Sequence, residues 1–229
     1  KVIFIRSLIF NILLYPGIIF SCLIGLPLLI LPKFFLRKLS SMLGWYFICL
    51  TKFILNTRVN IIGLEKLQRS QKFFIASAHQ SMFETFVYNY IIPKGFFVLK
   101  KELMNIPLFG LFLKKLKCIP IERGKIAKGN LNFSQQILKN ISDGNTLIIF
   151  PQGTRVPVDE NTPLKKGARR IYENLKIGCL PIKLDTGKVW PKNSFFKYPG
   201  EINFIFKDFI EPNLSSDDFI KKLEDSFYN

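Results

Sequence analysis

Residues 72–92 read KFFIASAHQSMFETFVYNYII, and this stretch decides the fold class. Its first part, Lys72–Ala76, is a short apolar run typical of a buried strand. Its last part, Met82–Ile91, is predicted to be a helix, and a polar turn that contains His79 joins the two. A strand that leads directly into a helix is the repeating unit of α/β proteins, and functional sites collect at such strand ends.

The same alternation continues through the chain from about Arg58 onward. Seven strands are predicted, at Val59–Ile62, Lys72–Ala76, Gly95–Val98, Cys118–Ile121, Thr146–Phe150, Cys179–Leu184 and Ile202–Phe206. Helices are predicted at Met82–Ile91, Leu108–Lys115, Lys128–Ile141, Gly167–Asn174 and Ser216–Ser226. This order indicates an α/β fold, a mixed and largely parallel β-sheet flanked by helices, over residues 58–229.

The remaining residues, 1–57, are expected to form an N-terminal helical segment that docks on a membrane. Residues 2–31 are almost continuously apolar, are interrupted by Pro16-Gly17, and have basic residues at both ends. If basic residues stay cytoplasmic, a hairpin bent at Pro16-Gly17 keeps both ends on one side. Each arm would be about 21 Å long, too short to cross about 30 Å of hydrocarbon. We expect this hairpin to enter one leaflet, with a single kinked span as the alternative. A further helix is expected at 40–56.

The composition favours a lipid surface as the partner. Lys and Arg number 33 against 16 Asp and Glu, a net charge of +17, and such a chain attracts polyanions. The basic residues are spread along the chain beside long apolar runs, which favours an anionic membrane over nucleic acid. The four cysteines lie far apart and there is one histidine, so the sequence offers no Cys/His zinc set.

The turn before the helix carries the single histidine of the chain, His79. A lone histidine at a strand end is either core filler or a catalytic group. Residues i and i+5 do not face each other on a regular helix, so His79 must lie on the turn and Glu84 in the first helical turn. The carboxylate can then hold the Nδ1 proton and leave Nε2 free to accept a proton from a hydroxyl. Ser81-x-x-Glu84 is also a capping box, so capping is the alternative role of Glu84.

A second polar cluster, FPQGTR at 150–155, follows the strand predicted at 146–150. Gly153 lets backbone approach a ligand closely, Thr154 offers a hydroxyl, and Arg155 offers a planar fork suited to phosphate. A plain turn with a solvated arginine is the alternative.

A third cluster, IPIERGK at 119–125, also follows a strand, and its Arg123 is a candidate for phosphate binding. Lys100, which follows another predicted strand, adds positive charge. Each of these clusters is a weak signal when it is taken alone.

Taken together and in order, these motifs resemble the glycerolipid acyltransferase family, which includes bacterial 1-acyl-glycerol-3-phosphate acyltransferases. The His-x4-Asp motif of that family corresponds to AHQSMFE at 78–84, and its motif with an arginine after an Ile-rich strand corresponds to IER at 121–123. Its F-P-E-G-T-R motif corresponds to FPQGTR, and its short strand with proline corresponds to CLPIK at 179–183. The resemblance covers about residues 58–212.

The resemblance implies transfer of a fatty acyl group from acyl-CoA or acyl carrier protein to the free hydroxyl of 1-acyl-glycerol-3-phosphate (lysophosphatidic acid), which makes phosphatidic acid. It implies no metal or other cofactor and a place at the cytoplasmic face of a bacterial inner membrane. His79 is then the base and Glu84 its orienting partner. The residues expected to bind substrate are Lys100, Arg123, Gln152, Gly153, Thr154 and Arg155.

Three positions depart from the family pattern. Glu84 stands in place of Asp, Gln152 in place of Glu, and Ala78 in place of a common Asn. The longer side chain of Glu84 moves the carboxylate, and Gln152 keeps hydrogen bonding without the charge. Two alternatives follow: an acyltransferase for another acceptor, such as glycerol 3-phosphate or another lysophospholipid, and a non-catalytic lipid-binding paralogue.

Overall fold

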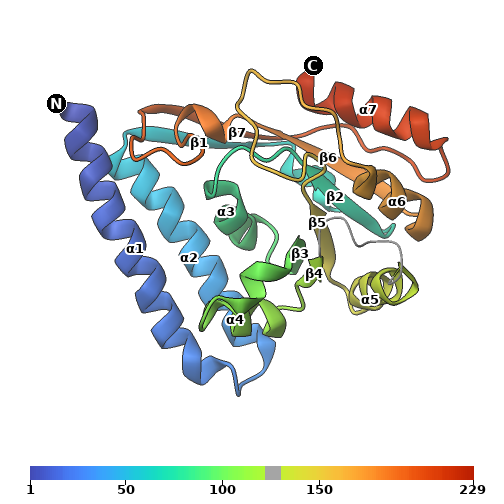
Figure 1. The fold of residues 1–229 in the computed structure, drawn as a ribbon, viewed down its shortest axis with the longest axis horizontal. Coiled ribbons are helices and arrows are strands. Elements are labelled where there is room, and N and C mark those ends of the chain that lie inside the picture. The colour runs from blue at the N-terminus through green and yellow to red at the C-terminus, as the bar shows by residue number, and fades with distance from the viewer. Residues whose placement is uncertain (122–129) are drawn as a thin grey trace.

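A computed structural model of the chain describes residues 1–121 and 130–229. Within these residues seven strands form one sheet in the order β1-β7-β6-β2-β5-β3-β4 (Figure 1). The strands are β1 (Thr57–Ile62), β2 (Phe73–Ser77), β3 (Gly95–Lys100), β4 (Ile119–Ile121), β5 (Thr146–Ile149), β6 (Gly178–Leu184) and β7 (Gly200–Phe206). The α-helices are α1 (Val2–Leu28), α2 (Lys33–Ile54), α3 (Phe83–Ile91), α4 (Phe109–Lys115), α5 (Asn130–Ser142), α6 (Lys166–Leu175) and α7 (Ser216–Tyr228). Three short 3-10 helices are η1 (Leu64–Leu67), η2 (Lys101–Asn105) and η3 (Thr186–Lys188).

The sheet is mixed and mostly parallel, as the alternation of strands and helices predicts. β2 pairs in parallel with β5 and β6, and β3 pairs in parallel with β5 and β4. The antiparallel neighbours are β6 and β7, and β1 joins β7 in parallel. The carboxyl ends of β2, β3, β4, β5 and β6 therefore meet at one edge, where α/β sheets bind ligands.

The two faces of the sheet are covered by different helices. β2 shows this directly, because successive side chains of a strand point to opposite faces. The ring of Phe74 contacts Phe219 of α7, whereas the hydroxyl of Ser77 lies 2.6 Å from that of Tyr88 in α3. Figure 1 shows α2 and α3 on one side of the sheet and α5, α6 and α7 on the other.

The N-terminal segment differs from the expected hairpin. α1 continues unbroken through Pro16 and Gly17, so the predicted bend there is wrong. α2 supports this stretch: the Tyr46 ring packs where a Cβ on Gly17 would lie, and its hydroxyl donates to the carbonyl of Leu13 at 2.9 Å. The chain turns instead between Leu28 and Lys33. The helix expected at 40–56 begins earlier and forms the second arm of a pair with α1.

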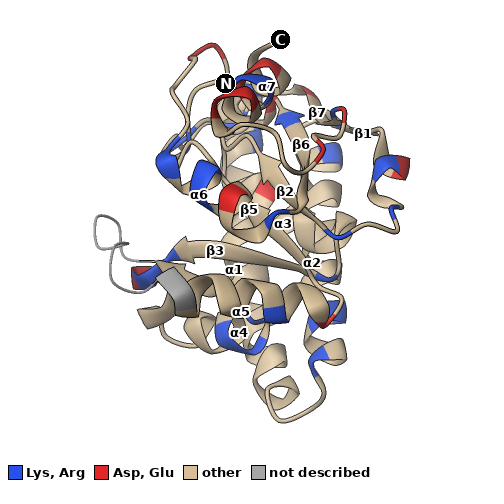
Figure 2. Ribbon diagram, turned by 90° about the vertical axis from the view of Figure 1, so that its right-hand side faces the viewer, with Lys and Arg blue, Asp and Glu red and all other residues tan. Residues whose placement is uncertain are grey.

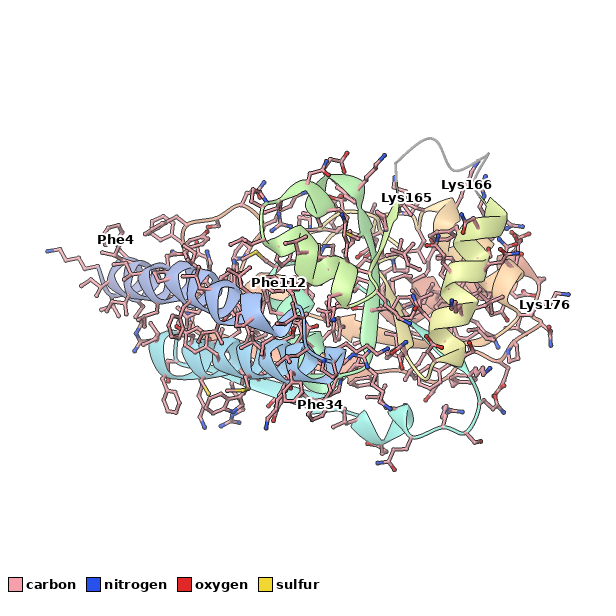
Figure 3. All side chains as sticks on the ribbon, turned by 90° about the horizontal axis from the view of Figure 1, so that it is seen from below. Phe4, Phe34, Phe112, Lys165, Lys166 and Lys176 are labelled. Atoms are coloured by element: carbon pink, nitrogen blue, oxygen red, sulfur yellow. The ribbon has the colours of Figure 1, made fainter. Side chains whose placement is uncertain are left out.

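α1 lies along the rest of the molecule. Near its start, the hydroxyl of Ser7 accepts the backbone N–H of Lys197 at 2.9 Å. Near its end, Gly25 faces the ring of Phe112 in α4. The flank that faces away from the domain is apolar and exposed, with Phe4, Ile12, Ile19, Phe20 and Leu23 each at least half exposed. In α2, Phe34 is 65% exposed, and Figure 3 shows Phe4 and Phe34 toward opposite ends of the helix pair.

Candidate active site

His79 lies on the turn between β2 and α3, at the carboxyl edge of the sheet. Ala78 extends the pairing of β2 with β6, because its N–H donates to the carbonyl of Ile182 at 3.0 Å. The turn then leaves the sheet, and α3 begins at Phe83, one residue later than predicted. The imidazole of His79 packs flat against the ring of Phe150, with centroids 4.1 Å apart. The imidazole therefore lies between the end of β2 and the ring of Phe150.

The imidazole of His79 and the carboxylate of Glu84 are in contact. His79 Nδ1 lies 2.8 Å from Glu84 Oε1, and the side chains are 17% and 0% exposed. With Nδ1 held by the carboxylate, Nε2 is the ring nitrogen that can exchange a proton with a ligand. This geometry matches the one expected from the five-residue spacing.

The carboxylate of Glu84 also orders the turn. Oε1 accepts the backbone N–H groups of Gln80 and Ser81, each at 2.8 Å. Oε2 accepts the hydroxyls of Ser81 at 3.0 Å and of Thr186 at 2.8 Å. Ser81 in turn accepts the N–H of Phe83, which caps the start of α3. Helix capping and contact with the histidine are thus simultaneous roles of one carboxylate rather than alternatives.

These contacts determine the charge of Glu84. Burial by itself raises the pKa of this carboxyl, but the hydrogen bond and charge of His79 and the N–H groups of Ser81 and Gln80 outweigh that effect. The net pKa lies below the ordinary value of 4.5. The positive end of the α3 dipole favours the same ionised state. A buried anion therefore stands next to Nδ1 at neutral pH.

The FPQGTR turn after β5 and the residue that follows it form hydrogen bonds with both the N–H and the carbonyl of His79. Gln152 Oε1 accepts the N–H of His79 at 2.8 Å, and the N–H of Val156 donates to the carbonyl of His79 at 2.8 Å. Gln152 Nε2 donates to the hydroxyl of Tyr228 in α7 at 3.2 Å. An amide serves both contacts, because it accepts with its oxygen and donates with its nitrogen. Gly153 at the centre of the turn has φ of +69°, which favours glycine.

Thr154 and Arg155 lie at the outer side of this turn and have a cationic neighbour that sequence reasoning missed. Lys192 Nζ lies 3.3 Å from Thr154 Oγ1 and 3.1 Å from the carbonyl of Arg155. Arg155 Nη2 donates to Asn193 Oδ1 at 3.4 Å. Lys192 belongs to the segment after β6, another strand whose carboxyl end meets this edge. That position in the fold is the signal that could have identified it.

Lys100 and Arg123 are the other two cationic residues predicted to bind substrate. Lys100 is the exposed last residue of β3, at the carboxyl edge. β5 separates β3 from β2, so Lys100 lies two strand spacings, about 10 Å, from the histidine turn. Arg123 lies outside the described residues. The last residue of β4, Ile121, pairs with Lys100, so this strand also ends at the carboxyl edge.

This arrangement can perform base chemistry beside two cationic side chains. Nε2 is positioned to take a proton from a hydroxyl, and the buried carboxylate stabilises the imidazolium that results. Arg155 and Lys192 supply two cations next to the same turn. Among residues 1–121 and 130–229, no group of His, Cys, Asp or Glu side chains is arranged to hold a metal ion.

Comparisons with known proteins give one consistent result. The family model described as Acyltransferase matches residues 58–185. The chain is 34% identical to a 1-acyl-sn-glycerol-3-phosphate acyltransferase of Pseudomonas aeruginosa, over 69% of this chain and 61% of that protein. It is 30% identical to the Saccharomyces cerevisiae enzyme of that name, over 76% of this chain and 60% of that protein, and 26% identical to that of Helicobacter pylori, over 88% and 85%. The chain therefore spans about 60% of the length of the first two relatives.

A solved structure has the same fold. The 1-acyl-sn-glycerophosphate (LPA) acyltransferase PlsC from Thermotoga maritima superposes with a TM-score of 0.72. The match covers 96% of this chain and 94% of that chain at 20% sequence identity. It extends beyond the region of the family model and includes most of the N-terminal helices.

Proposed function

Because this chain belongs to the acyltransferase family, we propose that it transfers a fatty acyl group to the free hydroxyl of 1-acyl-glycerol-3-phosphate and so makes phosphatidic acid. The donor is an acyl thioester, on CoA or acyl carrier protein. The observation that carries the proposal is the 2.8 Å contact between His79 Nδ1 and the buried carboxylate of Glu84 at the carboxyl edge of the sheet. This pair leaves one ring nitrogen to act as a base on a hydroxyl.

The reaction needs no covalent enzyme intermediate. His79 Nε2 takes the proton of the acceptor hydroxyl as its oxygen attacks the thioester carbonyl carbon. The C–S bond then breaks, and the imidazolium returns the proton to the leaving thiolate. Glu84 remains ionised throughout and stabilises the imidazolium. Base catalysis of this kind contributes about 10²–10⁴-fold, so the rest of the acceleration comes from positioning of the substrates.

Positioning of the acceptor depends on its phosphate. Arg155 is suited to this group because its planar fork can bind two oxygens at once. Lys192 adds a second cation beside the same turn, at hydrogen-bonding distance from Thr154. Gln152 and Gly153 keep the turn against the histidine backbone. Lys100, the last residue of β3, and Arg123, two residues after β4 in the sequence, are proposed to bind the same anionic substrate.

The proposed catalytic domain covers residues 58–229, and residues 1–57 dock it on a membrane. α1 has 27 residues and includes an 18-residue stretch with a mean hydropathy of 2.1, so its length and composition would suffice to cross a bilayer. Its contacts with the domain near both ends favour a different placement, with α1 lying along the bilayer and its apolar flank in one leaflet. Figure 2 shows more Lys and Arg than Asp and Glu over the ribbon, which suits an anionic surface. We place the protein at the cytoplasmic face of a bacterial inner membrane.

The test is an acyl-transfer assay with the purified chain on anionic vesicles. Lysophosphatidic acid, glycerol 3-phosphate and other lysophospholipids are offered as acceptors, each with acyl-CoA or acyl carrier protein as donor. Wild type should acylate lysophosphatidic acid fastest, and His79→Ala should lower kcat by about 10²–10⁴-fold.

Two outcomes contradict the proposal. Turnover by His79→Ala at the wild-type rate removes His79 from the chemistry. Vesicle binding by wild type without any thioester cleavage indicates the non-catalytic paralogue. Circular dichroism and vesicle sedimentation of His79→Ala verify that fold and docking are intact. Asn174→Ala, an exposed change in α6, is the matched control.

A further inference from the structure

The segment between η3 and β7 exposes aromatic side chains that the domain does not cover. This segment, the aromatic loop, comprises residues 190–198 with the sequence WPKNSFFKY. Phe195, Phe196 and Tyr198 are 44%, 41% and 39% exposed. The rings of Phe195 and Phe196 pack edge to face with centroids 5.5 Å apart, and together they form an exposed apolar patch of the kind that marks an interaction surface.

The aromatic loop is held in this conformation from inside by Lys197. This side chain is 3% exposed, and its ammonium donates to the carbonyls of Ser194 and Phe195 and lies 5.3 Å from the centroid of the Trp190 ring. Burial lowers its pKa to about 8. Lys197 is therefore the buried member of this part of the loop, whereas the two phenylalanines before it are exposed.

One end of the aromatic loop is continuous with the apolar flank of α1. The rings of Phe4 and Phe195 have centroids 5.8 Å apart, and Asn11 Nδ2 donates to the carbonyl of Phe195 at 3.2 Å. The Ser7 hydroxyl accepts the backbone N–H of Lys197. Figure 1 shows this segment, before β7, beside the N-terminal end of α1. The exposed rings of the loop and the exposed side chains of α1 therefore form one surface.

The other end of the aromatic loop touches the candidate active site. Lys192 lies within 3.3 Å of the Thr154 hydroxyl, and Asn193 accepts a hydrogen bond from Arg155. Only two residues, Asn193 and Ser194, thus separate Lys192 from the exposed ring of Phe195. This short connection fixes the distance between the candidate active site and the surface that covers the exposed rings.

We propose that the aromatic loop is a second membrane-contact element, which inserts Phe195 and Phe196 into the boundary between headgroups and acyl chains of an anionic bilayer. The insertion holds Lys192 and Arg155 at the level of the lipid phosphates, so that a lysophospholipid reaches them from within its own leaflet. This inference rests on the proposed function. A bilayer is the occupant because it covers the loop and the long flank of α1 with one continuous surface, and because Lys192 complements anionic headgroups.

The test compares Phe195→Ser/Phe196→Ser with a matched double variant, Leu64→Ser/Leu138→Ser. The control removes two apolar side chains that are 43% and 42% exposed but lie in η1 and α5, away from the loop. Sedimentation with vesicles of phosphatidylcholine and phosphatidylglycerol measures the partition coefficient of each. The loop variant should bind about tenfold more weakly than wild type, and the control as wild type. Phe195→Trp/Phe196→Trp should restore binding, because tryptophan favours the membrane interface.

Kinetics separate this inference from the proposed function. With lysophosphatidic acid in vesicles, the loop variant should show about a tenfold higher apparent KM for the acceptor. With a short-chain acceptor dissolved as monomers, its kcat/KM should equal that of wild type. Vesicle partition of the loop variant equal to wild type overturns the loop proposal, as does a change confined to its oligomeric state. If wild type transfers no acyl group, the proposed function fails, and the partition measurement still decides whether the loop contacts membranes.

Discussion

Replacement of Glu84 by glutamine tests the electrostatic role of this carboxylate with little change in shape. The amide oxygen can still accept the ring Nδ1–H of His79 and the backbone N–H groups of Gln80 and Ser81. The amide nitrogen takes the place of Oε2, where the hydroxyls of Ser81 and Thr186 now donate. Both hydroxyls can rotate and accept instead, so we expect stability to fall by about 1–2 kcal/mol.

The expected loss of activity is much larger than the loss of stability. During proton transfer the imidazolium lies beside Glu84, with 2.8 Å between Nδ1 and Oε1. Two unit charges about 4 Å apart attract by about 4 kcal/mol at an effective dielectric constant of about 20. Each 1.36 kcal/mol is tenfold in rate. Because the amide dipole retains part of this attraction, we expect kcat to fall by about 10²–10³-fold with both KM values near wild type.

The assay is steady-state acyl transfer to lysophosphatidic acid, with urea unfolding measured on the same preparations. Ser81→Ala is the matched control, because it removes the cap on the Phe83 N–H and one bond to Glu84 but leaves the contact with His79 in place. This control should lose about 1 kcal/mol of stability with kcat within a few fold of wild type. A Glu84→Gln enzyme with kcat within threefold of wild type would refute the electrostatic reasoning and leave Glu84 as a helix cap.

The pH dependence of stability provides a further check on the same residue. The folded pKa of Glu84 lies below its ordinary value of 4.5, so its ionisation stabilises the fold fully at pH values above that ordinary value. That contribution is lost as pH falls through the folded pKa. The gap in unfolding free energy between wild type and Glu84→Gln should therefore be constant near neutral pH and shrink below about pH 4. A gap that is independent of pH down to acid unfolding contradicts the assigned ionisation.

The remaining predictions concern the turn after β5. Arg155→Ala and Lys192→Ala should each raise the acceptor KM about tenfold without changing the donor KM, as expected for charge-assisted phosphate contacts. Lys188→Ala is the control, because Lys188 is an exposed neighbour paired with Asp185. If the acceptor KM of the Arg155 or Lys192 variant is unchanged, that residue does not belong to the site. Gln152→Ala should leave the backbone N–H of His79 unpaired, which lowers the free energy of unfolding in urea by about 1–3 kcal/mol and also lowers kcat. Wild-type values of the unfolding free energy and of kcat would show that this contact is dispensable. Gly153→Ala places a side chain at φ of +69° and should cost about 1–2 kcal/mol in thermal unfolding, whereas an unchanged midpoint would mean that the turn adopts another conformation.

Most of the α/β domain could be predicted because its signals are local. Every predicted strand and helix between residues 58 and 229 is present among the described residues, with ends displaced by at most two residues. The start predicted at Lys128 lies outside the described residues. The contact between His79 and Glu84 was also predictable, since five residues across a strand-to-helix turn leave few places for the two side chains. Local stereochemistry thus determines the elements and the contact between His79 and Glu84.

The N-terminus shows where local rules fail. A proline inside a helix removes one backbone hydrogen bond, and Pro16-Gly17 in isolation predicts a break. In the folded chain the Tyr46 side chain of α2 fills the space beside Gly17, and α1 runs straight through. Packing between two helices outweighs the local penalty, and no pattern within residues 2–31 reports the position of Tyr46.

The sequence by itself determined the order of the elements, the carboxyl edge as the place of the site, and the pairing of His79 with its carboxylate. The tertiary structure alone decided which distant groups complete that site. Gln152, which holds the histidine backbone, is 73 residues away from it, Thr186 is 102 residues from Glu84, and Lys192 is 38 residues from Thr154. The physical reason is that strand order and side-chain packing, rather than local conformation, bring these residues together, and many strand orders are compatible with the same local pattern.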